Sequence, residues 1–291
     1  MSALNGYLRA ELLVEPDWLW EHRSDSTLRI VDCGSPEAYD RAHIPDAVRL
    51  GQGDYDPGRS RSEPWDPWLK DRNDPIHVME PEPFANLVER LGISDDTTVV
   101  AYDDFNGSFA TRLWWILTYY GHPNVKVLNG GWQRWLDEGL PATFRENLPE
   151  PDTFLPRPNE AMRIRFDELK ARHAEPNLQI VNVLPPGMYA GTDNPFGNKH
   201  VGHIPGSVNV PIERFFVAED VPTIKPASEL ETVLAEAGLS PQQETVIHCQ
   251  AGVRTTMGVF VTTLLGWDRV RAYEASMAEW ANRDDTAVTT G

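Results

Sequence analysis

The chain has 291 residues, 41% of them hydrophobic, which suffices for two domains with buried cores and argues against disorder. Its formal net charge of -18 disfavours nucleic acid and anionic membranes as partners, because a surplus of basic residues to neutralise phosphates is missing. Its two cysteines, Cys33 and Cys249, provide neither a disulfide framework nor a zinc-ligand spacing, and we expect no metal or organic cofactor.

Residues 1–14 lack the apolar core and the small-residue cleavage site of a secretory signal. No apolar run in the sequence reaches the length needed to span a bilayer. Together with the low cysteine content, these features lead us to expect a cytoplasmic protein that does not bind membranes.

The first half of the sequence alternates short β-branched strands with amphipathic helices. An entry helix is expected within residues 12–22, with Asp17 as a possible N-cap, and another begins at Ser35 and Pro36, a capping serine followed by proline. The other expected elements are strands at residues 28–32, 47–50, 97–102 and 125–128 and helices at residues 83–91, 109–120 and 132–138. This order predicts an α/β domain, with a mostly parallel sheet and helices on both faces.

Residues 51–75 form a Gly-, Pro-, Asp- and Trp-rich insertion without a clear period. Long loops of this kind in compact domains are typically functional or packed on a neighbour. We interpret the insertion as cover for a domain interface, with surface decoration as the alternative.

A Pro- and Glu-rich stretch, residues 142–162, has the composition of a semi-rigid linker. The pattern then restarts, with an entry helix at residues 165–174 and strands at residues 178–182, 246–248 and 270–273. We therefore divide the chain into an N-terminal domain (residues 1–145), a linker (146–162) and a C-terminal domain (163–291), related by internal duplication.

Cys249 ends one of these strands and precedes a short turn and an apolar helix. Loop amides and the positive end of the helix would cradle an anion on the sulfur and would lower the pKa of the thiol. Arg254 adds a planar fork of donors. The substrate-binding loop is expected to consist of Gln250, Ala251, Gly252, Val253, Arg254 and Thr255. The alternative is a buried cysteine with a packing role.

The Cys-x-x-Gly-x-Arg motif at Cys249 resembles the active-site loop of rhodanese-type sulfurtransferases. Three further motifs carry the resemblance: Tyr39-x3-His-Ile-Pro-x-Ala47, His203-Ile-Pro-Gly-Ser207 and Leu128-Asn-Gly-Gly-Trp132. The likeness covers nearly the whole chain and implies two tandem rhodanese domains of the thiosulfate and 3-mercaptopyruvate sulfurtransferase type.

The two halves differ where the chemistry is expected. The strand that corresponds to Cys249 ends in Asp103 and Asp104, and carboxylates there would repel an anion and cannot act as a sulfur nucleophile. Two-domain members of the family likewise keep a catalytically silent N-terminal copy, so the resemblance implies that only the C-terminal domain is catalytic.

The remaining candidate residues are expected to have structural roles. His248 precedes Cys249 in a strand, where adjacent side chains face opposite sides, so we favour a packing or hydrogen-bonding role over general base catalysis. His43 and His203 lie in duplicated His-Ile-Pro turns, and Cys33 ends a buried strand.

The sequence departs from the family at the end of the first C-terminal strand. Leu184 and Met188 stand where the family often carries arginines that hold the carboxylate of 3-mercaptopyruvate. We therefore expect thiosulfate to be preferred as the donor, with 3-mercaptopyruvate or a persulfide as alternatives.

These features together predict a thiosulfate sulfurtransferase that works through a Cys249 persulfide, with cyanide or a thiol as acceptor. A phosphatase of the same fold is a weaker alternative, because phosphatases resembling rhodaneses have Cys-x5-Arg whereas Arg254 follows Cys249 after four residues. The non-enzyme alternative is a sulfur-carrier or regulatory rhodanese module.

Overall fold

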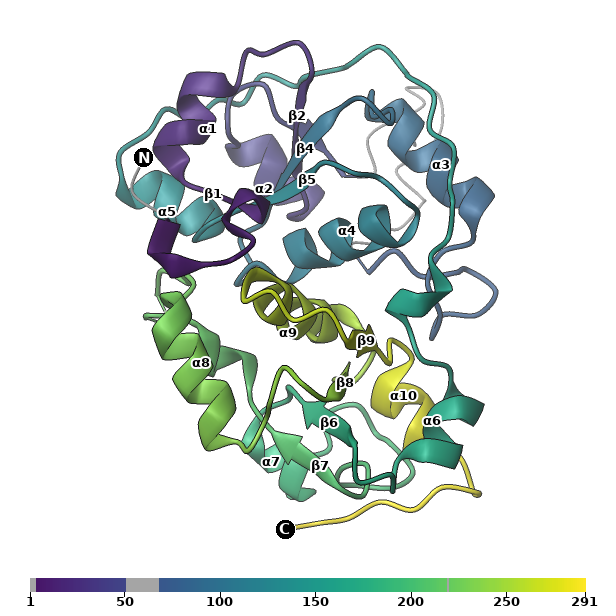
Figure 1. Ribbon diagram of the computed structural model, residues 1–291. Helices are drawn as coiled ribbons and strands as arrows, with labels where there is room; N and C mark the ends of the chain where they lie inside the picture. Colours follow the sequence, from purple (N-terminus) through teal and green to yellow (C-terminus); the bar gives the residue numbers. More distant parts are fainter. Residues whose placement is uncertain (1–3, 51–67, 219) are drawn as a thin grey trace.

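The computed structural model describes residues 4–50, 68–218 and 220–291, which form two α/β domains stacked on each other (Figure 1). The N-terminal sheet has the strand order β1 (Leu13–Val14), β5 (Val125–Leu128), β4 (Thr98–Tyr102), β2 (Leu28–Asp32) and β3 (Val48–Arg49). The C-terminal sheet has the order β7 (Ser207–Asn209), β6 (Leu178–Asn182), β8 (Glu244–His248) and β9 (Val270–Ala272). All neighbouring strands are parallel, which confirms the predicted fold class.

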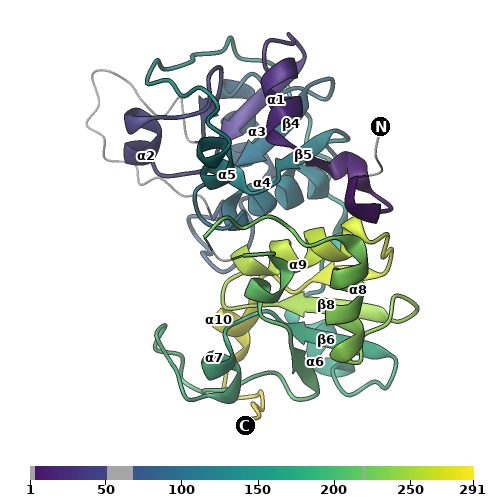
Figure 2. The same cartoon turned by 90° about the vertical axis from the view of Figure 1, so that its left-hand side faces the viewer.

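Helices flank both sheets (Figures 1 and 2). In the N-terminal domain they are α1 (Pro16–His22), α2 (Pro36–Arg41), α3 (Pro81–Arg90), α4 (Ser108–Tyr119) and α5 (Gly131–Asp137). In the C-terminal domain they are α6 (Phe166–Arg172), α7 (Pro186–Ala190), α8 (Ala227–Glu236), α9 (Val253–Leu264) and α10 (Ser276–Trp280). Short 3-10 helices are η1 (Leu4–Gly6), η2 (Ala10–Leu12), η3 (Glu160–Met162) and η4 (Ile212–Phe215).

Most of the predicted elements are found with small shifts at their ends, whereas β1, β7, α7 and α8 were not predicted. Ser35 caps α2 as expected, because its hydroxyl accepts a hydrogen bond from the amide of Ala38. The assignment of Asp17 as an N-cap is wrong. The N-cap of α1 is Glu15, since Pro16 occupies the first helical position, where its fixed φ and missing N–H are tolerated.

Successive residues of β4 face opposite sides of the sheet, as the pleat requires. Val100 joins a core cluster with Leu19 of α1 and Trp135 of α5, whereas Val99 joins a second cluster that contains Leu113 of α4. The second cluster continues through both domains, so the interface is part of one hydrophobic core.

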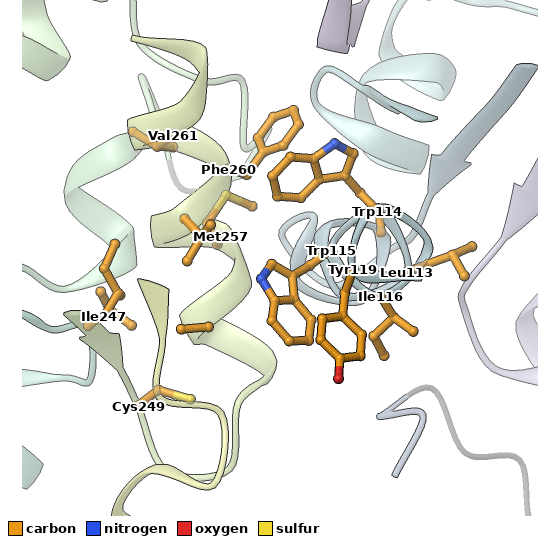
Figure 3. Close-up of a cluster of buried hydrophobic side chains, with 14 of the residues drawn as sticks. Leu113, Trp114, Trp115, Ile116, Tyr119, Ile247, Cys249, Met257, Phe260 and Val261 are labelled. Carbon is orange, nitrogen blue, oxygen red and sulfur yellow. The ribbon is translucent and has the colours of Figure 1, made fainter. Parts of the chain in front are cut away.

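Helices α4 and α9 form the centre of that interface (Figure 3). Trp114 meets Phe260 edge to face, with 4.8 Å between ring centroids, and the hydroxyls of Thr111 and Thr256 lie 3.4 Å apart. Figure 3 also shows Cys249 at the end of its strand, beside these helices. The domain contact therefore lies next to the predicted catalytic loop.

Two connecting segments pack on this core. The chain between α5 and α6 is bonded to the N-terminal domain, with the amides of Asp152, Arg157 and Asn159 donating to the carbonyls of Glu89, Tyr120 and Tyr119. Of the predicted insertion, residues 51–67 lie outside the described residues. Its described end does reach the interface, where the carbonyl of Trp68 accepts a hydrogen bond from Nε of Arg112. No helix among the described residues is long and apolar enough to cross a membrane.

Candidate active site

Cys249 lies between the end of β8 and the start of α9, in the strand, turn and helix order that the sequence predicted. Its Sγ accepts a hydrogen bond from the amide of Gly252 at 3.1 Å. The first amides of α9 lack partners within the helix, and the helix dipole places positive potential at this end. The sulfur is therefore held at the anion-attracting end of a twelve-residue helix.

Gly252 is required at its position for two separate reasons. Its φ of +87° lies in the left-handed region that favours glycine. A Cβ atom on it would lie only 2.5 Å from the carbonyl oxygen of Glu274. The turn that brings the Gly252 amide to the sulfur thus depends on close packing against the residue two positions beyond β9.

Ser276, which the sequence analysis missed, supports the same loop. Its hydroxyl accepts a hydrogen bond from the amide of Cys249 at 3.0 Å and lies 4.0 Å from Sγ. It also lies 2.8 Å from the carbonyl of Tyr273, so its single proton serves either that oxygen or the sulfur. Ser276 has a φ of +56°, which is unusual for a residue with a side chain. The equivalent residue in the N-terminal domain is Gly131, with a φ of +55°. A glycine at that place in the duplicated sequence was the signal that could have pointed to Ser276.

The other predicted loop residues contact different parts of the domain. The side chain of Gln250 exchanges two hydrogen bonds with Asn198, at 2.8 and 2.9 Å. Ala251 is half-buried, and Val253 and Thr255 are buried. The guanidinium of Arg254 donates to Glu213 at 2.8 Å, and its side chain is 28% exposed. Arg254 can therefore reach solvent, but one of its donors is shared with a carboxylate.

The three histidines considered in the sequence analysis, His248, His43 and His203, are held in place by packing. His248 is fully buried, and burial lowers its pKa to about 3, so it is neutral. Neither of its ring nitrogens has a hydrogen-bond partner among the described residues. His43 and His203 stack on Tyr39 and Tyr189, with ring centroids 3.6 and 3.7 Å apart, and the Nδ1 atom of each lies beside the carbonyl of its tyrosine.

The second cysteine lies in a different environment from Cys249. Cys33 is fully buried after β2, and burial raises its thiol pKa well above the ordinary value. Its amide donates to the carbonyl of Tyr102 at 2.8 Å. These contacts agree with the structural role expected for it.

In the N-terminal domain, the loop equivalent to that of Cys249 already binds an anion. The carboxylate of Asp103 accepts hydrogen bonds of 2.7 to 2.8 Å from four backbone amides, those of Phe105, Gly107, Phe109 and Ala110. Burial raises the pKa of Asp103, and these four donors oppose that shift by favouring the carboxylate. The cradle at the start of α4 is thus filled by the chain itself.

Three charged residues behind the Cys249 loop were also missed by the sequence analysis. The carboxylate of Glu274 lies 3.1 Å from Nζ of Lys70 and 3.2 Å from Nη2 of Arg112, and all three side chains are at most 5% exposed. Burial alone would raise the pKa of Glu274, but the two cations lower it to about 2. Lys70 and Arg112 belong to the N-terminal domain, so this cluster joins the two domains.

Leu184 and Met188 follow β6, beside the end of β8, where the amide of Val183 donates to the carbonyl of His248. Leu184 is buried, and Met188 is partly buried against the core. Neither side chain offers a charge to a carboxylate. Within residues 4–50, 68–218 and 220–291, no group of three His, Cys, Asp or Glu side chains is placed to hold a metal ion.

Comparisons with known proteins agree with this architecture. Residues 15–138 and 165–283 each match the rhodanese-like domain. The sulfur carrier protein TtuD of Thermus thermophilus is 33% identical, over 98% of this chain and 99% of that protein. The thiosulfate sulfurtransferase of Corynebacterium glutamicum is 31% identical, over 99% of this chain and 94% of its own. The crystal structure of SseA from Escherichia coli, a 3-mercaptopyruvate sulfotransferase, superimposes with a TM-score of 0.77 at 25% identity, covering 91% of this chain and 98% of that one.

Proposed function

The chain belongs to the rhodanese family, with two tandem rhodanese-like domains, and we propose that it is a sulfurtransferase that uses Cys249 as its nucleophile. It takes sulfane sulfur from a small donor and passes it to an acceptor. The donor is thiosulfate, and the acceptor is cyanide or a thiol.

The reaction has two steps. The Cys249 thiolate attacks the outer sulfur of thiosulfate, a Cys–S bond forms, and the S–S bond of the donor breaks as sulfite leaves with the electron pair. The enzyme then carries a Cys249 persulfide. Cyanide attacks the terminal sulfur of that persulfide, forms thiocyanate and restores the thiolate. Such a scheme predicts ping-pong kinetics.

The hydrogen bond from the amide of Gly252 to Sγ of Cys249 is the observation that carries this proposal. A second observation supports it: in the N-terminal domain, backbone amides bind the carboxylate of Asp103. There the amides of Phe109 and Ala110 donate to a carboxylate, and their equivalents at the start of α9 are Arg254 and Thr255. A persulfide sulfur on Cys249 would meet those two amides in the same way.

The choice of donor depends on the charges near the loop. A carboxylate that leaves water is destabilised unless a cation or several donors replace its hydration. Leu184 and Met188 provide neither, whereas the loop amides and Arg254 suit the sulfonate oxygens of thiosulfate. The likeness to SseA keeps 3-mercaptopyruvate as an alternative donor, and persulfides are another.

A sulfur-carrier role is the second candidate, favoured by the similarity to TtuD. A carrier would accept sulfur on Cys249 and release it only to a protein partner. Turnover separates the two roles, because an enzyme forms many equivalents of thiocyanate whereas a carrier stops near one.

We also propose that residues 163–291 form the catalytic domain, that residues 146–162 form a linker, and that residues 1–145 form a domain without catalytic activity. The carboxylate of Asp103, which occupies the N-terminal cradle, supports this division. Asp103 cannot carry sulfane sulfur, and its carboxylate occupies four of the loop amides that a donor anion would use.

The test is steady-state thiocyanate formation from thiosulfate and cyanide with the purified chain, together with intact-mass analysis after thiosulfate alone. We expect many turnovers and the addition of one sulfur atom, mapped to Cys249. Cys249→Ser should remove both signals, whereas Cys33→Ser should remove neither. Full activity in Cys249→Ser would refute the proposal.

A further inference from the structure

The cluster of Lys70, Arg112 and Glu274 is built from segments far apart in the chain. Lys70 follows the insertion, Arg112 lies on α4, and Glu274 follows β9. Both oxygens of Glu274 are used: Oε2 accepts from the two cations, and Oε1 accepts from the amide of Val78 at 2.7 Å. The N-terminal domain therefore holds this carboxylate by three contacts.

Glu274 in turn supports the catalytic loop through its backbone. Its carbonyl oxygen faces Gly252 so closely that a Cβ on the glycine would lie 2.5 Å away. The amide of Gly252 donates to Sγ of Cys249. A continuous path of contacts therefore runs from Lys70 and Arg112, through Glu274 and Gly252, to the reactive sulfur.

The charges of the cluster also favour an anion on that sulfur. Two cations share one carboxylate, so the three groups together carry one positive charge. Nη1 of Arg112 is buried without a hydrogen-bond partner among the described residues. Burial lowers the pKa of Lys70 to about 8, and the negative charges of Glu274 and of Cys249 act against that shift. A net positive charge behind the turn of Cys249 and Gly252 favours an anion at the sulfur.

We propose that Lys70 and Arg112 are positioning residues for the Cys249 loop, through which the N-terminal domain orders the loop and favours the anionic sulfur. The inference rests on the proposed function only in taking Cys249 as the reactive group. It gives the catalytically silent domain a direct part in the reaction at the other domain's cysteine.

Two other arginines near the loop, among the described residues, are paired with carboxylates outside the cluster. Arg254 is bonded to Glu213, Arg163 is bonded to Glu160, and the closest contact of Arg163 with Glu274 is 3.9 Å. His248 is neutral. Lys70, Arg112 and Glu274 are therefore the charged groups to vary in a test.

The test measures the rate of Cys249 alkylation by iodoacetamide as a function of pH in the full chain, followed by mass spectrometry of the Cys249 peptide. Lys70→Met should move the midpoint to higher pH, with about tenfold slower alkylation below it, which corresponds to about one pKa unit. Lys70→Arg should stay near the parent. Lys126→Met, which removes a lysine bonded to the carbonyl of Glu11, is the matched control and should also match the parent.

A parental profile in folded Lys70→Met would overturn the proposal. If that variant fails to fold, Glu274→Gln tests the same proposal, with the alkylation midpoint expected to move in the opposite direction. Neutralising the shared carboxylate removes a negative charge that both cations contact and should move the midpoint to lower pH. An unchanged or raised midpoint would overturn the proposal. Alkylation needs no sulfur donor, so a failure of the sulfurtransferase proposal would appear separately, as absent thiocyanate with a shifted alkylation profile.

Discussion

Asp103 and Cys249 occupy equivalent positions in the two domains. Each follows the strand that pairs with the first long strand of its sheet, and the carbonyl of each accepts a hydrogen bond from the start of the last helix, from Trp132 and Met277 respectively. One cradle binds its own carboxylate, and the other presents a sulfur atom. The duplication therefore yields one filled and one chemically available anion site.

Asp103→Ala should destabilise the fold and leave the chemistry intact. The amides of Phe105, Gly107, Phe109 and Ala110 would lose their acceptor, and an unsatisfied donor costs about 1–3 kcal/mol where it is buried and less where water reaches it. We expect a lower melting temperature that sulfate raises more in the variant than in the parent, because sulfate can bind the emptied cradle. Asp104→Ala, at the exposed neighbouring position, is the control. A melting temperature equal to that of the parent would contradict the role given to Asp103.

Ser276 should be needed for activity although it strains the backbone. Ser276→Ala and Ser276→Gly both remove the hydroxyl that accepts the Cys249 amide, and we expect about tenfold lower kcat/KM for thiosulfate in both, the loss of one buried hydrogen bond. Glycine tolerates the positive φ, so Ser276→Gly should be more stable than Ser276→Ala by about 1 kcal/mol. Kinetics and urea unfolding of the pair measure the two effects separately. Parental kcat/KM in both variants would exclude a role in the reaction.

Arg254 should bind the donor. Arg254→Ala should raise KM for thiosulfate about tenfold or more, and Arg254→Lys should restore only part of the loss, since lysine lacks the planar fork. Glu213→Gln should lower KM, because it releases the guanidinium from its carboxylate partner. Arg214→Ala, which breaks an exposed pair with Glu236, is the control. Ordinary thiosulfate kinetics in Arg254→Ala would mean that the donor is held elsewhere.

The parent should have a higher kcat/KM for thiosulfate than for 3-mercaptopyruvate. Leu184→Arg combined with Met188→Arg should shift the preference towards the keto acid, because each charge-assisted pair is worth about 1.5–3 kcal/mol. Parallel kinetics with both donors at equal ionic strength measure the shift. A parent that prefers 3-mercaptopyruvate would show that another cation reaches the donor.

His248 should make the fold sensitive to acid. Its folded-state pKa of about 3 lies below the ordinary value of 6.5. Between these two pH values His248 is protonated in the unfolded chain and neutral in the folded chain. This contribution to stability is complete above pH 6.5 and is lost as the pH falls towards 3. Between pH 6 and pH 4, His248→Gln should therefore lose about 2 kcal/mol less stability than the parent. His200→Gln, at a half-buried position, is the control, and identical pH slopes for parent and His248→Gln would contradict the prediction.

Most of the order of strands and helices, the duplication and the Cys249 loop could be predicted from the sequence. These features depend on local patterns: alternation of β-branched runs with amphipathic segments, the Ser35–Pro36 helix start and the short motif after β8. Prediction failed for the ten-residue helix α8, for β7 and for two very short elements. Strand β1 has two residues and helix α7 has five, too few to show a period.

The sequence by itself determined the fold class, the position of the candidate nucleophile Cys249 and the absence of a cysteine from the equivalent position in the first domain, because each depends on residues that are adjacent in the chain. Only the tertiary structure decided what surrounds the sulfur. Lys70 and Glu274 are 204 positions apart, and the left-handed backbone of Ser276 becomes meaningful only where its hydroxyl meets the amide of Cys249. Such contacts depend on how the two domains pack across α4 and α9, and no local pattern encodes that packing.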